Sequence, residues 1–124
     1  MPSFFTQKLS WSQFNDFPHT TFNWIGLDGS QVLTHMTPVN TYNAQATVSD
    51  AINGIKKHKN LEVTDISILP FGNGDGGGGA VPPMLESLRR LRAVANNNHE
   101  LPKIGYGKGK SVSEMYGAIL KQTK

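Results

Sequence analysis

The stretch Ile66-Ser-Ile-Leu-Pro-Phe-Gly-Asn-Gly-Asp-Gly-Gly-Gly-Gly79 decides the fold class of this sequence. It begins as a short apolar run of strand character and continues as a loop with six glycines within eight residues. A segment with helical spacing follows at 84–97, and Pro82 and Pro83 suit its first turn. A strand, a glycine-rich loop and a helix in this order predict an α/β fold.

The rest of the chain extends this pattern. Two apolar runs, at 22–27 and 31–36, flank Asp28-Gly29, a pair that is typical of hairpin turns. The remaining predicted elements are a strand at 3–9, a helix at 48–58 capped by Thr47 or Ser49, and a last helix capped by Ser111 with Glu114. Few of these strands can be parallel to one another, so we expect this chain to be an internal segment of a larger α/β domain.

Composition excludes several classes of protein. The 124 residues contain no cysteine, which rules out disulfides and thiolate metal sites. No run of 18 apolar residues is present, and we expect no membrane partner. Residues 1–80 carry four basic and six acidic side chains, whereas residues 81–124 carry eight and three. We interpret the basic second half as solvated helix faces and expect no nucleic-acid partner.

Asp75 is the first candidate for chemistry. It is the one carboxylate in the glycine loop, at the end of a strand, where α/β proteins place their active sites. In a sheltered loop a carboxyl group can keep its proton near neutral pH and act as a general acid. Asp-Gly is also a common turn pair, so a purely structural role stays open.

The glycine loop also has a nucleotide-binding interpretation. Gly72, Gly74 and Gly77 match the dinucleotide fingerprint between a strand and a helix. Asp75 would, however, set a negative charge against the pyrophosphate, and the two prolines would withhold N–H donors from the phosphate oxygens. We therefore keep a dinucleotide-binding oxidoreductase only as a lesser alternative.

Histidines and aromatic residues give weaker signals. None of the four histidines has the spacing of a helical zinc site, and we expect no complete metal site in this chain. His35 alternates with Leu33 on a predicted strand and is expected to be a hydrogen-bonded core or rim residue. Trp24 is expected in the core, although the aromatic residues could also form a sugar-stacking surface. Tyr42 follows a strand end in a turn-rich loop and is expected to face a ligand.

Four blocks of sequence resemble one family. They are Phe-Phe-Thr-Gln-Lys-Leu-Ser-Trp at 4–11, Phe-Pro-His-Thr-Thr-Phe-Asn-Trp at 17–24, Leu-Asp-Gly-Ser-Gln-Val-Leu-Thr-His-Met-Thr-Pro at 27–38, and Phe-Gly-Asn-Gly-Asp-Gly-Gly-Gly-Gly at 71–79. In order and spacing they resemble the catalytic domain of class II α-mannosidases, glycoside hydrolase family 38, of the fungal vacuolar and cytosolic type. The resemblance covers residues 3 to 100. Relatives usually continue with Gly-Pro where this chain has Ala80-Val81.

The resemblance implies a fragment of a (β/α)-barrel of about seven strands and a retaining, zinc-dependent mannosidase. It places the carboxylate nucleophile and the zinc ligands outside this chain, so zinc belongs to the parent enzyme. We expect the parent to hydrolyse terminal α-mannosyl residues of oligosaccharides, and the isolated chain to be inactive. A non-catalytic, carbohydrate-binding remnant is the alternative.

Three residues acquire roles from the resemblance. Asp75 matches the general acid/base, Tyr42 matches a tyrosine that contacts the bound mannose, and Lys8 matches a basic position near the active site. Residues 1–103 are expected to belong to the catalytic domain, and residues 104–124 to form a divergent tail with a short helix. The resemblance implies a vacuolar or cytoplasmic protein and leaves a homo-oligomeric parent open.

Overall fold

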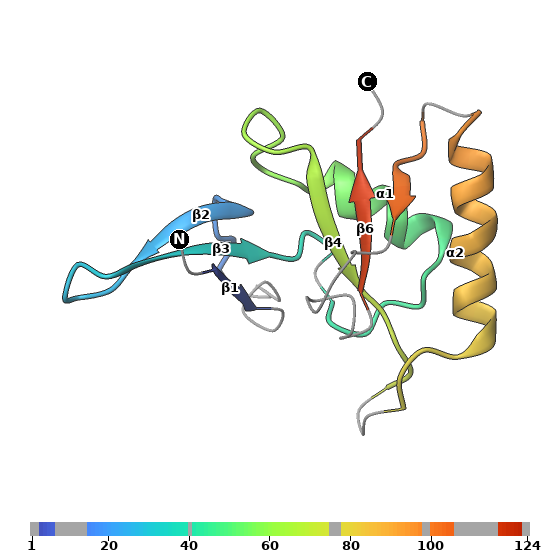
Figure 1. The fold of residues 1–124 in the computed structure, drawn as a ribbon, viewed down its shortest axis with the longest axis horizontal. Helices are drawn as coiled ribbons and strands as arrows, with labels where there is room; N and C mark the ends of the chain where they lie inside the picture. Colours follow the sequence, from blue (N-terminus) through green and yellow to red (C-terminus); the bar gives the residue numbers. More distant parts are fainter. Residues whose placement is uncertain are drawn as a thin grey trace.

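The computed structural model describes residues 3–6, 15–39, 41–74, 78–97, 100–105 and 117–122. In chain order the elements are β1 (Ser3–Thr6), β2 (Thr21–Ile25), β3 (Gln31–Met36), α1 (Val48–Lys56), β4 (Ile66–Pro70), α2 (Pro82–Ala95), β5 (Lys103–Gly105) and β6 (Gly117–Lys121). They form two three-stranded sheets, and the helices lie with the second sheet (Figure 1). No helix of this described part is long and apolar enough to cross a membrane.

The first sheet has the order β1-β3-β2 and contains the predicted hairpin. β3 pairs antiparallel with β2 from Thr21↔His35 to Ile25↔Gln31, and pairs parallel with β1. At the hairpin turn, Oδ1 of Asp28 accepts hydrogen bonds from the Ser30 hydroxyl and backbone N–H at 2.7 and 3.0 Å. These bonds hold the pKa of the Asp28 carboxyl below its usual value. The turn at Asp28-Gly29 is therefore confirmed.

The second sheet, of order β4-β6-β5, differs from the prediction at its C-terminal side. The sequence predicted a last helix capped by Ser111 and no strand in this part of the chain. Residues 103–105 instead form β5, and residues 117–121 form β6, which pairs antiparallel with both β4 and β5. Ser111 and Glu114 lie outside the described residues. A five-residue segment such as 117–121 is too short for a periodicity that distinguishes strand from helix, and here its pairing partners decide. The α/β class is confirmed.

The core lies between the second sheet and the two helices. α1 packs against β4 and β6, and α2 packs against β5. A capping box joins the Thr47 hydroxyl and the Asp50 carboxylate at the start of α1. Gly54 lets α1 approach β6, because a Cβ atom there would lie 2.4 Å from Cδ1 of Leu120. Leu69, Leu88 and Leu120 are the largest apolar side chains that are fully buried.

In α2, helical spacing predicts a core face of Leu85, Leu88, Leu91 and Val94. Leu88 and Leu91 are buried, but Leu85 is 45% and Val94 is 51% exposed, so the buried face is displaced from the predicted one. The residues that α2 buries are Met84, Leu88, Leu91 and Ala95. They are spaced by four, three and four residues and so form one continuous stripe along the helix, which Leu85 and Val94 flank.

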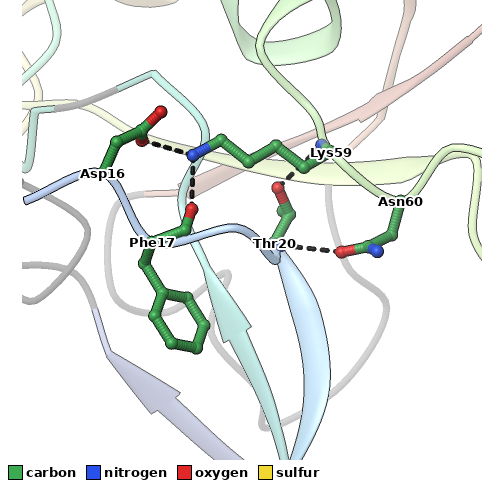
Figure 2. A network of polar contacts seen from close by, with 5 residues as sticks. All are labelled: Asp16, Phe17, Thr20, Lys59 and Asn60. Atoms are coloured by element: carbon green, nitrogen blue, oxygen red, sulfur yellow. Dashed lines mark hydrogen bonds and ion pairs between the residues drawn. The ribbon is translucent and has the colours of Figure 1, made fainter.

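The hairpin is fastened to the end of α1 by a polar network (Figure 2). The backbone N–H of Lys59 donates to the Thr20 hydroxyl at 2.9 Å. Oδ1 of Asn60 accepts from the backbone N–H of Thr20 at 2.7 Å and from that of Thr21 at 3.2 Å. The Lys59 ammonium also donates to the Asp16 carboxylate and to the Phe17 carbonyl. Segments about forty residues apart are thereby held together.

Replacing Leu120 by alanine should lower the free energy of unfolding by about 2–5 kcal/mol, because it removes a fully buried side chain of β6 that packs against α1. Leu27→Ala is the matched control, since Leu27 is fully exposed, and its effect should stay within about 0.5 kcal/mol. Urea unfolding of the 124-residue chain measures both. Equal effects of the two substitutions would contradict this core.

Asn60→Ala should cost about 1–3 kcal/mol, because the buried N–H of Thr20 would lose its acceptor. Asn97→Ala, at an exposed position after α2, is the control and should change stability little. The same unfolding experiment distinguishes them. An Asn60 variant as stable as the Asn97 variant would show that the network in Figure 2 does not hold the hairpin.

Candidate functional site

β4 runs into the glycine loop, which closes on itself. The backbone N–H of Asn73 donates to the carbonyl of Gly79 at 2.7 Å. A Cβ atom at Gly78 would lie 2.8 Å from the Asn73 carbonyl, and one at Gly72 would lie 3.4 Å from the Gly79 carbonyl. Glycine is therefore required at position 78, whereas a Cβ atom at position 72 would make an ordinary contact. Asp75, which the sequence places between these two ends, lies outside the described residues.

The loop that carries Tyr42 is bonded to the end of β4. Ala44 and Phe71 form a parallel bridge, in which the N–H of Ala44 donates to the Pro70 carbonyl at 3.2 Å. The N–H of Gly72 donates in turn to the Ala44 carbonyl at 3.1 Å. Tyr42 is half-buried, two residues from this bridge. The structure therefore brings together the two loops in which the sequence predicted site residues.

The Tyr42 loop is also attached to α2. Ala46 is fully buried, has a φ of 56°, and its carbonyl accepts a hydrogen bond from the Ser87 hydroxyl at 2.6 Å. A positive φ is unusual for alanine and indicates a backbone that its surroundings fix. Just beyond it, the Asp50 carboxylate accepts from the backbone N–H groups of Gln45 and Thr47 at 3.0 and 3.1 Å. The segment that follows Tyr42 is thus held by Ser87 of α2 and by Asp50 in the first turn of α1.

The predicted site residues are only partly placed. Tyr42 lies in the described loop, whereas Asp75 and Lys8 lie outside the described residues. Their roles stay predictions. Among the described residues, no three His, Asp or Glu side chains lie close enough together to hold a metal ion. This part of the chain therefore does not fit a zinc site.

Sequence reasoning overlooked a pair of histidines near the same strand. His35 and His58 have ring centroids 6.0 Å apart, and both bond to the backbone of β4. Burial lowers the pKa of His35 to about 4, and the nearby His58 adds to the shift. The prediction that His35 is a hydrogen-bonded core or rim residue is confirmed. Its pairing with His58 had no signal in the sequence, since 23 positions separate the two residues.

The prediction that Trp24 lies in the core is wrong. Its side chain is 40% exposed, and its ring lies 6.1 Å from that of Phe22, which lies 4.9 Å from that of Phe17. β2 pairs with one neighbour among the described strands, and most of its residues are exposed. β2 contains the aromatic and β-branched residues that are typical of buried strands, but among the described strands it lies at the edge of its sheet.

Comparison with known proteins gives the family. Residues 1–116 match the model described as the glycosyl hydrolases family 38 N-terminal domain. The chain is 47% identical over 121 residues to an alpha-mannosidase of Saccharomyces cerevisiae, which covers 97% of the chain and 11% of that relative. It is 47% identical over 104 residues to alpha-mannosidase G of Dictyostelium discoideum, covering 84% and 9%. With alpha-mannosidase 2C1 of Homo sapiens the identity is 43% over 101 residues, covering 82% and 9%.

The chain spans about a tenth of the length of these curated relatives. The family match extends through residue 116, and the boundary at residue 103 stays a prediction. Because the match includes the hairpin, the Tyr42 loop and the glycine loop, the described site lies within it. The chain belongs to glycosyl hydrolase family 38, within its N-terminal domain.

Proposed function

We propose that this chain acts within a protein of its relatives' length, here called the long form, and that the long form is a retaining α-mannosidase. The observation that carries the proposal is the Ala44↔Phe71 bridge. It joins the loop of Tyr42 to the strand end that leads to Asp75, in a chain whose relatives are named alpha-mannosidases. Terminal mannosyl residues of oligosaccharides are the proposed substrates.

The proposed fold of the long form is a (β/α)-barrel to which this chain contributes strands. β3, α1 and β4 follow one another, and the bridge after β3 is parallel to β4, as in a βαβ crossover. In such barrels the loops at the carboxyl ends of the strands form the active site. The loops of Tyr42 and Asp75 both follow the carboxyl ends of strands, which supports a shared site.

The proposed chemistry gives each of these residues one task. Asp75 donates a proton to the leaving glycosidic oxygen and later removes one from the attacking water. The Tyr42 ring contacts the sugar, and Lys8 supplies positive charge nearby. A second carboxylate, outside this chain, would form the covalent glycosyl intermediate. Zinc, which the resemblance implies for the long form, has no site among the described residues, and none of these steps uses it.

The proposed setting of the long form follows from the resemblance alone. We propose a vacuolar or cytoplasmic location and leave a homo-oligomer possible. The isolated chain, with one of the two carboxylates, should lack mannosidase activity, because the retaining reaction needs both.

Asp75→Asn in the long form should reduce turnover of mannosides with poor leaving groups by about 10²- to 10⁴-fold, because no acid protonates the departing oxygen. Aryl mannosides with good leaving groups need no such acid and should still form the glycosyl intermediate, visible as a burst of released phenol. Steady-state and burst kinetics on both substrate types measure this difference.

Asn73→Ala is the control, since it changes the neighbouring polar side chain of the same loop and leaves the carboxylate in place. It should affect both substrate types alike. An Asp75→Asn variant that keeps full activity on poor leaving groups would rule out the proposed acid. An Asp75→Asn variant that loses both types equally would point to a structural aspartate.

A further inference from the structure

We propose that His35 and His58 are positioning residues: as neutral rings they hold the outer edge of β4, and with it the glycine loop, against the hairpin from which the Tyr42 loop departs. The inference rests on the proposed function for its consequence in catalysis. Its structural part rests on the contacts of the two rings alone.

The first step concerns the edge of β4 that faces away from β6. In an antiparallel pair, alternate residues direct their N–H and C=O groups to the partner strand, and the others direct them outward. Ile66, Ile68 and Pro70 form the outward set. Nε2 of His58 lies 3.1 Å from the Ile66 carbonyl, and the N–H of Ile68 donates to Nε2 of His35 at 3.4 Å. Ala44 binds the next position, Pro70.

Two imidazoles and one short bridge therefore occupy positions where a neighbouring strand would otherwise pair. An edge with unpaired groups invites non-native pairing, and side chains that satisfy it remove that tendency. Along the chain, Tyr42 lies between His35 and Ala44, which bind adjacent outward positions of this one edge. The start and the end of the segment that carries Tyr42 are thus fixed to β4, the strand that leads to Asp75.

The second step concerns the protons on the rings. Nδ1 of His58 accepts from the N–H of Asn60 at 3.1 Å, so its proton lies on Nε2 and is donated to the Ile66 carbonyl. Nε2 of His35 accepts from Ile68, so its proton lies on Nδ1, which is 2.8 Å from the Thr21 hydroxyl. These hydrogen bonds assign opposite neutral tautomers to the two rings.

The third step concerns charge around the pair. Burial is the main cause that lowers the pKa of His35 to about 4, and the electrostatic effect of the nearby His58 adds to the shift. Burial also lowers the pKa of His58, against the opposing effects of the Ile66 carbonyl and Glu62. His19 contacts Asn60, with its Nδ1 3.4 Å from the amide nitrogen. The surroundings therefore favour the neutral rings that the tautomers require.

Protonation would release the edge. A proton on Nε2 of His35 faces the N–H of Ile68, so two donors oppose each other and the bond is lost. The pKa of His35 in the folded chain lies below the ordinary histidine value of 6.5, so the stabilisation is complete above pH 6.5 and is lost as pH falls toward about 4. Within that window the folded-to-unfolded ratio should fall about tenfold per pH unit through this one group.

Nuclear magnetic resonance on the 124-residue chain tests the structural part. With ¹⁵N-labelled histidine, His35 should show the Nδ1–H tautomer and His58 the Nε2–H tautomer at pH 7.5. As pH falls, the His35 ring should titrate well below 6.5, and the hydrogen-exchange protection of the Ile68 amide should fall with it. Equal tautomers in the two rings, or a His35 that titrates near 6.5 while Ile68 stays protected, would overturn the proposal.

Two variants separate titration from hydrogen bonding. His35→Gln keeps an oxygen that can accept from Ile68 but cannot titrate, so the Ile68 amide should stay protected at low pH. His35→Leu removes the acceptor, so protection should be lost at every pH. A glutamine variant that loses Ile68 protection in the same pH range as the native chain would contradict the proposed role of His35.

The long form tests the consequence for the site. The acid limb of the kcat/KM profile on an aryl mannoside should move to lower pH in His35→Gln, when each profile is scaled to its own maximum. Identical acid limbs in the native long form and its His35→Gln variant would contradict the positioning role. Since the tautomer measurement needs no activity, a failure of the mannosidase proposal would leave it unaffected and would be recognised separately.

Discussion

The outer edge of β4 is the constraint on which the described site depends. This strand pairs with β6 on one side, and on the other it is met by Ala44, His35 and His58. Backbone groups buried without partners are costly, so each of these contacts replaces a bond that a neighbouring strand would supply. Because the glycine loop begins where β4 ends, whatever fixes this edge also fixes the start of the loop.

Two further features make this edge a defined attachment. The Ser87 hydroxyl holds Ala46 from the side of α2, and the Asn60 amide holds the base of the hairpin. The Tyr42 loop and the glycine loop are themselves joined by the backbone hydrogen bonds of Ala44. Such bonds do not depend on side-chain rotamers, so they fix the two loops closely. A site built from loops on a fixed strand end is the arrangement that α/β enzymes use for catalysis.

How much the sequence predicted follows from the range of each interaction. The hairpin at Asp28-Gly29, β4 with its glycine loop, and both helices are set by turn chemistry, capping and periodicity within a few residues, and these predictions are confirmed. β5 and β6 depend on partners far along the chain, and no local pattern distinguishes 117–121 from a helix. The exposure of Trp24 and the contact between His35 and His58 likewise depend on tertiary structure.

The most direct measurement of the central claim is a crystal structure of the long form with a non-hydrolysable α-mannoside bound. The account predicts the Asp75 carboxyl about 2.6–3.2 Å from the glycosidic heteroatom, with the Tyr42 ring against the same sugar and the Ala44↔Phe71 bridge intact. A mannoside bound without contact to either residue, or Tyr42 and Asp75 facing different cavities, would contradict it.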